Sequence, residues 1–325
     1  MTNVYITIDT EYSSGLVSDL SDQDRRDNFA RSLACETPDG PGGITQKLEV
    51  FERYGIKAVF FVDPMPALVW GLAAIEDILA PIIEAGQDIQ LHCHTEWIRI
   101  AGDASPLKVK RAGKNLFEFT FDEQCEILDF ARETLMAAGA PSPLAFRAGN
   151  YGADDNTLRA LAQLGLRYDS SHCPALPVGA SRISLGPDTR DPVAYQGIIE
   201  VPVGSIGTLG GGQRHAQITA LSLNEMRAAI EHARDQRRES FTLVTHSFEL
   251  INRRKQQMNH IVRRRFEGLC KALSTMEAVR TANYRDDPPV VAVQSNPSEP
   301  LPASPLRTGY RYAEQLVSNT LYGAL

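Results

Sequence analysis

The stretch VYITIDTEY, residues 4–12, is an apolar, β-branched run that ends in two carboxylates. Such a run predicts a buried strand. Similar runs recur along the chain, at residues 58–62, 89–91, 144–146, 198–203 and 241–244. The segments between them have the periodicity of helices. Strands that alternate with helices along most of the chain indicate βαβ units, and hence a mostly parallel sheet that is closed or nearly closed as a barrel.

The helical segments carry their own start and stop signals. Residues 44–54 place apolar side chains on one face, and Gly55 follows as a stop. TFDE at residues 120–123 and SLNE at residues 222–225 have the pattern of capping boxes, in which a hydroxyl and a carboxylate cap the first turn. We therefore expect helices to begin at both places.

The composition excludes several classes of protein. Of the 325 residues, 43% are hydrophobic and 22% charged, which is enough apolar material for one large core. The net charge of −7 argues against a surface that binds nucleic acid throughout. The five cysteines are an odd number without a CxxC pair, which favours reduced thiols over disulfides or a zinc knuckle. No targeting segment or membrane-spanning run is evident, so we expect a cytoplasmic protein.

From about residue 286 the character of the sequence changes. Residues 286–306 are rich in proline and serine, which is typical of an extended connector. The following YRYAEQLVSNTLY, residues 310–322, predicts a helix with one stripe made of Tyr312, Leu316, Val317, Thr320 and Leu321. We expect this helix to dock on its own barrel or to join subunits of a homo-oligomer. The predicted organisation is a barrel over residues 1–285 and a tail over residues 286–325.

Polar residues just past a predicted strand are the first candidates for a functional site, because the chemistry of parallel α/β folds gathers where the strands end. Asp9 and Glu11 end the first strand. Two residues apart on an extended chain, they project to the same side and could enter one pocket. A surface turn is the alternative reading.

A second group follows another strand in DIQLHCHTEW, residues 88–97. Here His92, His94 and Glu96 alternate within five residues. Imidazole nitrogens and carboxylate oxygens are ligands that Zn²⁺ or a similar divalent ion accepts. The pattern therefore predicts a metal site, although a single histidine at such a place is more often structural.

Two further strand ends carry one notable residue each. In FRAGNYG, residues 146–152, Arg147 is suited to orienting a carboxylate or binding an anion, with a surface arginine as the alternative. In TLVTHSFEL, residues 242–250, His246 is suited to proton transfer near neutral pH. We expect both side chains to meet the other two groups at one mouth of the barrel.

The order of these motifs resembles that of the polysaccharide deacetylase superfamily, the NodB-homology enzymes, over about residues 4–275. GGITQKLEVFERYGIKAVFFVD, residues 42–63, is similar to that family's helix and second strand. DIQLHCHTEW, FRAGNYG and VTHSFEL are similar to its histidine, arginine and last motifs. The resemblance implies a distorted (β/α) barrel of about seven strands, a divalent metal, and hydrolysis of an N-acyl or related amide bond. HCHTEW is similar to a branch associated with lipopolysaccharide or surface-glycan biosynthesis.

Matched to the family's motifs, three residues acquire catalytic roles. The resemblance implies that Asp9 is the general base and that Arg147 orients it. It implies that His246 is the acid that protonates the leaving amine. Amides hydrolyse slowly because water is a poor nucleophile and the amine is a poor leaving group. A metal-activated water with a base corrects the first fault, and an acid corrects the second.

The metal ligands follow the family's pattern with two departures. The family's second carboxylate, usually an aspartate directly after the base, is here Glu11, one residue later. The resemblance implies that Glu11 and His92 bind the ion. The family's two histidine ligands are separated by three residues. Counted from His92, the position of the second histidine holds Glu96 in this sequence. The third ligand is therefore either Glu96 or His94.

Several other residues are candidates for contact with a substrate. Trp97 could stack on a sugar face, with core packing as the alternative. Tyr151 and His172 are candidate substrate-side residues. Two basic triplets, residues 253–255 and 263–265, would attract a diphosphate if they lined the mouth of the barrel. A solvated helix face is the alternative for both triplets.

These observations lead to one main hypothesis and two alternatives. The main hypothesis is a metal-dependent hydrolase, with Zn²⁺ as the expected ion, that removes an N-acetyl or similar acyl group from a glycan, a glycolipid precursor or a nucleotide sugar. The first alternative is hydrolysis of another linear or cyclic amide on the same fold. The second is a catalytically silent barrel that binds a glycan.

Overall fold

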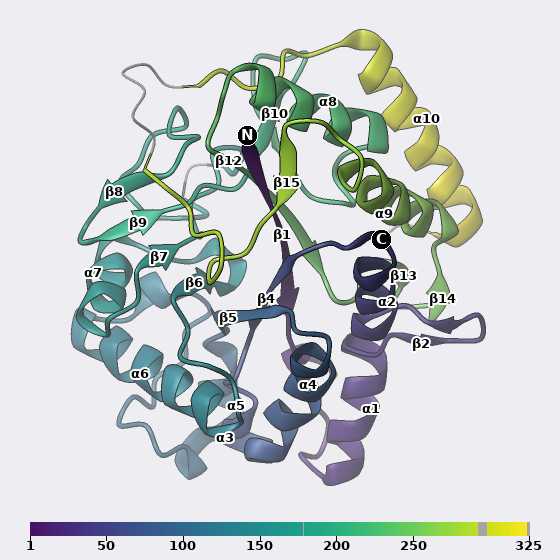
Figure 1. Cartoon of the computed structure of the whole chain (residues 1–325). Coiled ribbons are helices and arrows are strands. Elements are labelled where there is room, and N and C mark those ends of the chain that lie inside the picture. Colours follow the sequence, from purple (N-terminus) through teal and green to yellow (C-terminus); the bar gives the residue numbers. More distant parts are fainter. Residues whose placement is uncertain (178, 292–297, 324–325) are drawn as a thin grey trace.

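The computed structural model describes residues 1–177, 179–291 and 298–323, and within them one curled sheet of nine strands is surrounded by helices (Figure 1). In spatial order the strands are β12 (Ser240–His246), β1 (Thr2–Thr10), β4 (Ala58–Val62), β5 (Asp88–Cys93), β6 (Ala145–Ala148), β7 (Tyr168–Asp169), β9 (Ile198–Glu200) and β8 (Val193–Tyr195). The ninth strand, β15 (Val279–Thr281), pairs with the first residues of β1. Only the pair of β8 and β9 is antiparallel among these strands.

In the described chain, seven parallel strands follow one another from β12 to β9, the number that the resemblance implies. The chain after β9 then crosses back toward β12. The Val203 amide donates to the His172 carbonyl and the Gly204 amide to the Thr242 carbonyl, both at 2.9 Å. A Cβ at residue 204 would lie 2.7 Å from the Thr242 oxygen, so only glycine permits this approach. The sheet is thus a curled half-barrel, and the predicted α/β class is confirmed.

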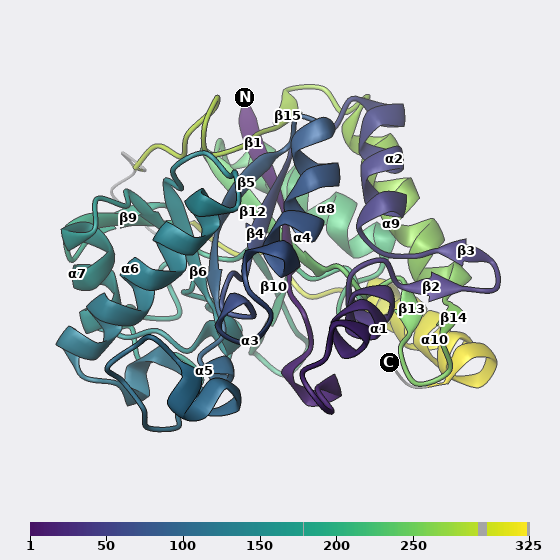
Figure 2. The same cartoon turned by 90° about the horizontal axis from the view of Figure 1, so that it is seen from below.

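Helices cover the outer face of the sheet (Figures 1 and 2). The α-helices of the described chain are α1 (Asp22–Ser32), α2 (Ile44–Tyr54), α3 (Ala67–Trp70), α4 (Leu72–Glu84), α5 (Glu96–Ala101), α6 (Phe121–Ala137), α7 (Asp155–Gln163), α8 (Leu223–Asp235), α9 (His260–Leu273) and α10 (Pro305–Tyr322). Both predicted capping boxes are present, at the first turns of α6 and α8. Gly55 ends α2 with a positive φ of 62°. The helix boundaries encoded in the sequence are therefore those of the structure.

Outside the large sheet, the described part of the chain forms three small hairpins. They are formed by β2 (Glu36–Thr37) with β3 (Gly40–Pro41), β10 (Ser205–Gly207) with β11 (Gln213–His215), and β13 (Ile251–Asn252) with β14 (Gln257–Met258). The β13–β14 hairpin comes shortly after β12, and its turn contains Arg253 and Arg254. The first basic triplet is therefore in a hairpin turn rather than on a helix face.

Alternation along β1 sorts its side chains between two hydrophobic clusters. Val4, Ile6 and Ile8 belong to the large cluster that includes the helices, whereas Tyr5 belongs to a smaller cluster with side chains of other strands and Tyr284. Residues of the same parity as Tyr5 share the inner face of the half-barrel. This parity places Asp9 on the inner face, at the carboxyl end of β1.

The C-terminal helix α10 lies beside α8 and α9 (Figure 1). Polar contacts hold it there: Glu314 pairs with Arg265 at 2.5 Å, Arg311 with Glu225 at 3.1 Å, and Ser318 accepts from Asn259 at 2.9 Å. The five residues of the predicted apolar stripe are all exposed. The helix thus docks on its own barrel, which is one of the two expectations, but it does so through polar residues and not through the predicted stripe. Assembly of subunits through the stripe stays a prediction.

The rest of the predicted tail is only partly described. Residues 292–297 of the predicted connector and residues 324–325 at its end lie outside the described residues. Across the described ranges, none of the helices has both the length and the apolar character that crossing a bilayer requires.

Candidate active site

The inner face of β1 ends at Asp9, which is almost completely buried. Within the sheet Asp9 stands in register with His246 of β12 and with Phe61 of β4. Parallel pairing thus brings together two residues separated by most of the chain. The sheet register alone explains why the predicted base and the predicted acid share one site.

Arg147 of β6 binds Asp9 across the interior of the half-barrel. Its Nη1 donates to Asp9 Oδ1 at 2.8 Å and to Thr7 Oγ1 at 2.8 Å, while Nε and Nη2 donate to the carbonyl and hydroxyl of Ser170. The guanidinium also lies 4.5 Å from the centre of the Phe61 ring. Every contact restricts the plane of the guanidinium, so the charge is fixed against one carboxylate oxygen.

This arrangement keeps Asp9 ionised. Burial alone would raise the pKa of Asp9, but the charge of Arg147, followed by those of His92 and His246, outweighs it and lowers the pKa below its usual value. A carboxylate held in this way is unprotonated at neutral pH. It is therefore able to accept a proton.

His246 faces Asp9 from the end of β12, with 3.9 Å between its Nε2 and Asp9 Oδ2. Its other nitrogen, Nδ1, lies 2.8 Å from Glu249 Oε1, and that carboxylate is also held by Gln217 and Thr245. Burial lowers the pKa of His246, but the hydrogen bond and charge of Glu249 outweigh it, and the pKa rises to about 9. The imidazole is therefore protonated at neutral pH.

Glu249 is a site residue that the sequence did not single out. It stands three residues after His246 in the VTHSFEL stretch, and it is itself almost completely buried. The signal available in the sequence was a carboxylate three residues after a histidine at a strand end. The position of Glu249 next to His246 Nδ1 depends on the conformation of the turn after β12, which the sequence does not specify.

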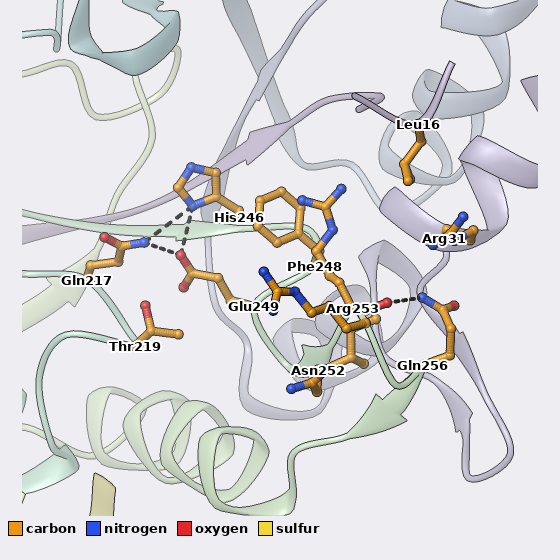
Figure 3. Close-up of a pocket in the computed structure, with 12 residues that line it drawn as sticks. Leu16, Arg31, Gln217, Thr219, His246, Phe248, Glu249, Asn252, Arg253 and Gln256 are labelled. Atoms are coloured by element: carbon orange, nitrogen blue, oxygen red, sulfur yellow. Dashed lines mark hydrogen bonds and ion pairs between the residues drawn. The ribbon is translucent and has the colours of Figure 1, made fainter. Parts of the chain in front are cut away.

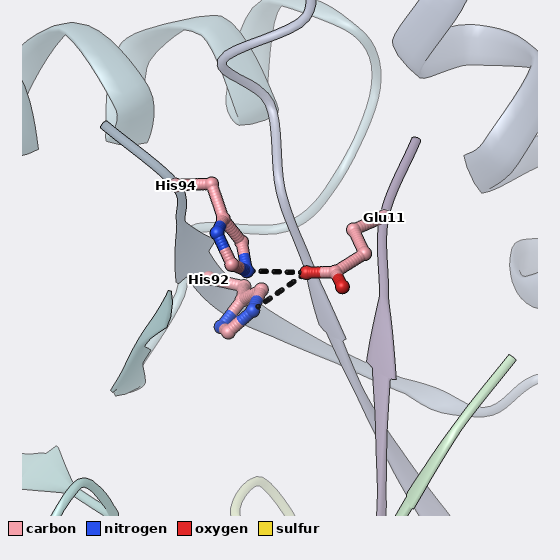
Figure 4. Close-up of side chains that lie close together, drawn as sticks. All are labelled: Glu11, His92 and His94. Carbon is pink, nitrogen blue, oxygen red and sulfur yellow. Dashed lines mark hydrogen bonds and ion pairs between the residues drawn. The ribbon is translucent and has the colours of Figure 1, made fainter. Parts of the chain in front are cut away.

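Glu11, His92 and His94 form a metal-capable group (Figure 4). Among the described residues they are the one set of histidines, cysteines and carboxylates that could hold an ion, with ligand atoms within 4.8 Å of one another. Both Nε2 atoms face Glu11 Oε2, at 3.2 Å from His92 and 2.5 Å from His94. These distances place two nitrogens and one oxygen around a common point.

The Nδ1 atom of each histidine contacts an oxygen that orients the ring, and this arrangement suits the binding of a cation at Nε2. Nδ1 of His92 lies 2.7 Å from the Arg147 carbonyl oxygen, and Nδ1 of His94 lies 3.3 Å from Glu96 Oε2. Both oxygens are acceptors, so Nδ1 of each ring can donate to them and leave Nε2 as the atom that would bind a cation. Histidine ligands oriented by an outer oxygen are the usual arrangement at metal centres.

The structure favours His94 over Glu96 as the third ligand. Glu96 lies at the first turn of α5 and contacts the far nitrogen of His94, so it is outside the metal-capable group. The helical conformation that begins at Glu96 breaks the alternation of the sequence HCHTE. His94 therefore belongs to the metal-capable group with His92, whereas Glu96 contacts the His94 Nδ1 on the side away from Glu11.

Asp63 is a second residue that the sequence did not assign a role. It follows β4, is completely buried, and accepts from the His94 amide at 3.4 Å through Oδ1. Within the described chain its Oδ2 has no hydrogen-bond partner, and burial raises the pKa of Asp63 to about 6. The FFVD ending of its strand was the signal, which matches the strand-end rule that identified the other residues.

Two of the expected substrate contacts are corrected by the structure. Trp97 is completely buried and packs edge-on against Trp70, with 5.3 Å between ring centres, so it has no face open to a sugar. His172 is almost completely buried, and its Nε2 lies 3.2 Å from the Gly186 carbonyl oxygen. Both residues support the fold: the tryptophan belongs to the core and the histidine holds a loop.

Tyr151 is placed beside the catalytic groups. It has a positive φ of 57°, and its ring packs with Cys173 and Val203. Burial raises the pKa of its hydroxyl well above the usual value, while Arg147, the next largest influence, lowers it. Contact of Tyr151 with a substrate stays a prediction.

The site opens into a cavity of about 650 Å³ (Figure 3). His246, Phe248 and Glu249 form one side of it, and the β13–β14 hairpin forms another. This volume is within the range of cavities that hold small molecules. The catalytic histidine candidate is therefore accessible from a space large enough for a sugar.

Comparison with known proteins supports the fold. No protein-family model matches the sequence, and no curated protein does. A solved structure of a protein from Mycobacterium smegmatis, assigned to the polysaccharide deacetylases, superposes with a TM-score of 0.55 at 17% identity, over 91% of this chain and 95% of that chain. This chain has the polysaccharide deacetylase fold. Identity this low shows the fold alone.

Two further likenesses are weaker. A family 4 carbohydrate esterase from Streptomyces lividans in complex with acetate gives a TM-score of 0.44 at 10% identity, over 89% of this chain and 97% of that one. A pseudoenzyme of the same esterase family from Bacillus anthracis gives 0.36 at 12% identity, over 76% and 56%. Scores at this level carry no argument about activity, so the function is argued from the site.

Proposed function

We propose that this chain is a metal-dependent hydrolase that removes an N-acetyl or similar acyl group from a sugar-derived substrate. One observation carries the proposal: an ionised carboxylate at Asp9, a protonated imidazole at His246 and a metal-capable group meet at the carboxyl ends of neighbouring strands. These are the three components that amide hydrolysis requires. The polysaccharide deacetylase fold supports the choice of substrate class.

Glu11, His92 and His94 would hold the ion, and two nitrogens with one oxygen suit Zn²⁺ or a similar divalent metal. When bound, such an ion lowers the pKa of a water molecule toward neutrality and polarises a carbonyl oxygen. Glu96 and the Arg147 carbonyl fix the histidine rings for this purpose.

Asp9 acts as the base in the first half of the reaction. The oxygen of water adds to the amide carbon, and Asp9 takes the proton that this oxygen loses. Arg147 keeps Asp9 ionised and holds the carboxylate toward the centre of the site. Thr7 and Ser170 prevent the guanidinium from turning away.

His246 acts as the acid in the second half. The bond between the carbonyl carbon and the nitrogen breaks, and Nε2 of His246 gives its proton to the departing amine. Glu249 keeps that proton in place at neutral pH, because it raises the pKa of His246 to about 9. The products are a carboxylic acid and a free amine.

The test is acyl release by the metal-loaded protein. Acetate release from N-acetylated sugars, lost on Asp9→Asn and on treatment with a chelator, would support the proposal. Release only from small cyclic or linear amides without a sugar would favour the alternative amidase. Absence of a bound ion together with no release from any amide would favour a silent glycan-binding barrel.

We further propose that the protein is a cytoplasmic enzyme of surface-glycan biosynthesis. Localisation of the tagged protein and glycan analysis of a deletion strain would test this proposal.

A further inference from the structure

We propose that the cavity beside His246 is an anion subsite, which takes a phosphate or diphosphate group attached to the sugar whose amide is cleaved. This inference rests on the proposed function, and it narrows the substrate to a phosphate-bearing sugar. It is carried by three arginines around the cavity, Arg31, Arg253 and Arg254, and by the distance of one of them from the catalytic groups.

The three guanidinium groups come from separate segments. Arg31 is near the end of α1, and Arg253 is in the turn of the β13–β14 hairpin (Figure 3). Arg254 follows Arg253 in the same turn. Arg31 and Arg254 are exposed, and Arg253 is half-buried. The cavity is thus positively charged both at its opening and in its depth.

Over the described ranges, none of these three arginines forms an ion pair with a carboxylate. Other arginines of the chain are paired; Arg265, for example, binds Glu314, and Arg238 binds Asp191. Three unpaired positive charges at one cavity repel one another, which is unfavourable unless an anion is bound there.

Among the described residues, one acidic side chain lines the cavity, and it does not neutralise them. Glu249 is almost completely buried, and both of its oxygens are engaged, Oε1 with His246 and Gln217 and Oε2 with Thr245. A ligand entering the cavity therefore meets positive charge first. An anionic group is the ligand that compensates it.

Arg253 places this charge close to the site of reaction. Its guanidinium lies 4.2 Å from the centre of the Phe248 ring, and that ring lies 5.1 Å from the His246 ring at an angle of 30°. Arg253 is thus separated from His246 by one aromatic ring. An anion bound to Arg253 would leave the adjoining sugar next to His246 and Asp9.

The number and kind of charges favour phosphate over carboxylate. A single carboxylate is satisfied by one bidentate arginine, whereas a phosphate or diphosphate presents more oxygens and more charge. The second basic triplet lies away from this cavity: Arg263 pairs with Glu267, Arg265 is buried against Glu314, and Arg264 lines a different pocket. Of the two triplets, the first one lines this cavity, through Arg253 and Arg254.

The test measures binding separately from turnover. The probes are N-acetylglucosamine 1-phosphate and neutral N-acetylglucosamine, titrated calorimetrically into the metal-loaded protein. Charge-assisted hydrogen bonds predict that the phosphate-bearing sugar binds about 10- to 100-fold tighter, with an advantage that shrinks as salt is added. Equal affinity for the two probes would overturn the proposal.

The variant Arg253→Gln/Arg254→Gln should remove this advantage and leave the affinity for the neutral sugar unchanged. Lys255→Gln is the matched control, because Lys255 stands next in the same turn but does not line the cavity. Arg31→Gln, on an exposed side chain, is a second variant that does not endanger folding. If the phosphate advantage survives in both arginine variants, the phosphate is bound elsewhere and the subsite does not exist.

Asp9→Asn separates this inference from the proposed function. It should abolish acyl release and keep the phosphate advantage, because Asp9 does not line the cavity. A protein that prefers the phosphate-bearing sugar but releases no acyl group would contradict the hydrolase alone. Competition by inorganic pyrophosphate, a nucleotide diphosphate and vesicles that contain a lipid diphosphate would then identify the source of the phosphate.

Discussion

Arg147 Nη1 lies 2.8 Å from Asp9 Oδ1, and both side chains are almost completely removed from solvent. A buried ion pair of this kind adds little net stability, because the desolvation of two charges offsets their attraction. Removal of one partner is costly, since the other charge is then buried alone. The pair is therefore best explained by its effect on Asp9, whose ionised form it maintains.

Arg147→Gln is expected to lower the free energy of unfolding by roughly 3–5 kcal/mol, because Asp9 remains buried without its counter-charge. The pKa of Asp9 should rise, and acyl release at neutral pH should fall by about 100-fold or more. Arg147→Lys keeps the charge but cannot bond Thr7, Ser170 and Asp9 together, so it should lose activity with a smaller loss of stability. Urea denaturation and acetate release measure the two effects. Wild-type stability in Arg147→Gln would show that Asp9 is not held by this pair.

The pair of His246 and Glu249 predicts a dependence of stability on pH. In the folded chain the pKa of His246 is about 9, above its ordinary value of 6.5. The charged imidazole therefore stabilises the fold fully below pH 6.5, and this contribution is lost as the pH rises through 9. For the chelated protein we expect the free energy of unfolding to fall by on the order of 2–3 kcal/mol over that range.

Glu249→Gln should remove most of this pH dependence and lower the pKa of His246, so that the alkaline limb of the activity profile moves to lower pH. His260→Gln is the control, because His260 lies on the surface near Asp39. NMR titration of the imidazole measures the pKa directly. A wild-type His246 that titrates near 6.5 would contradict the role assigned to Glu249.

The sequence predicted the fold well because its signals are local. The apolar runs, the two capping boxes and Gly55 each specify an element through neighbouring residues, and the structure has those elements. The convergence of Asp9 and His246 also followed, since parallel strands end at the same edge of a sheet. Strand-end position was thus sufficient to find the centre of the site.

Predictions that depended on side-chain environment were less accurate. Alternation could not show that α5 begins at Glu96, so the third ligand stayed open between Glu96 and His94. The burial of Trp97 depends on Trp70, which is distant in sequence. The outward stripe of α10 could not be foreseen either, because the barrel surface beneath it offers charged partners such as Glu225 rather than an apolar face.

Trp97 is expected to matter for stability and not for substrate binding. Trp97→Ala should lower the free energy of unfolding by about 3–5 kcal/mol, because it leaves a cavity beside Trp70. The milder Trp97→Phe should retain the affinity for an acetylated sugar, since no face of the indole is open to solvent. Thermal unfolding and sugar titration measure the two effects. A loss of affinity in Trp97→Phe without a loss of stability would restore the stacking role.

Metal retention distinguishes the two candidates for the third ligand. His92→Gln and His94→Gln each remove a nitrogen of the metal-capable group, so the purified variants should hold less than a stoichiometric amount of ion. Glu96→Gln should still bind the ion, but about 10- to 100-fold more weakly, because Glu96 only orients the far nitrogen of His94. Elemental analysis and competition with a chelator measure these affinities.

Glu126→Gln is the matched control for Glu96→Gln, since it alters a glutamate of α6 that is remote from the metal-capable group. Because each histidine must be unprotonated at Nε2 to bind a cation, the affinity of the wild-type protein should also fall as the pH is lowered. The order of the variants' metal affinities decides whether His94 or Glu96 is the third ligand. If Glu96→Gln lost the ion while His94→Gln kept it, the carboxylate would be the ligand, and the first turn of α5 would have to rearrange when metal binds.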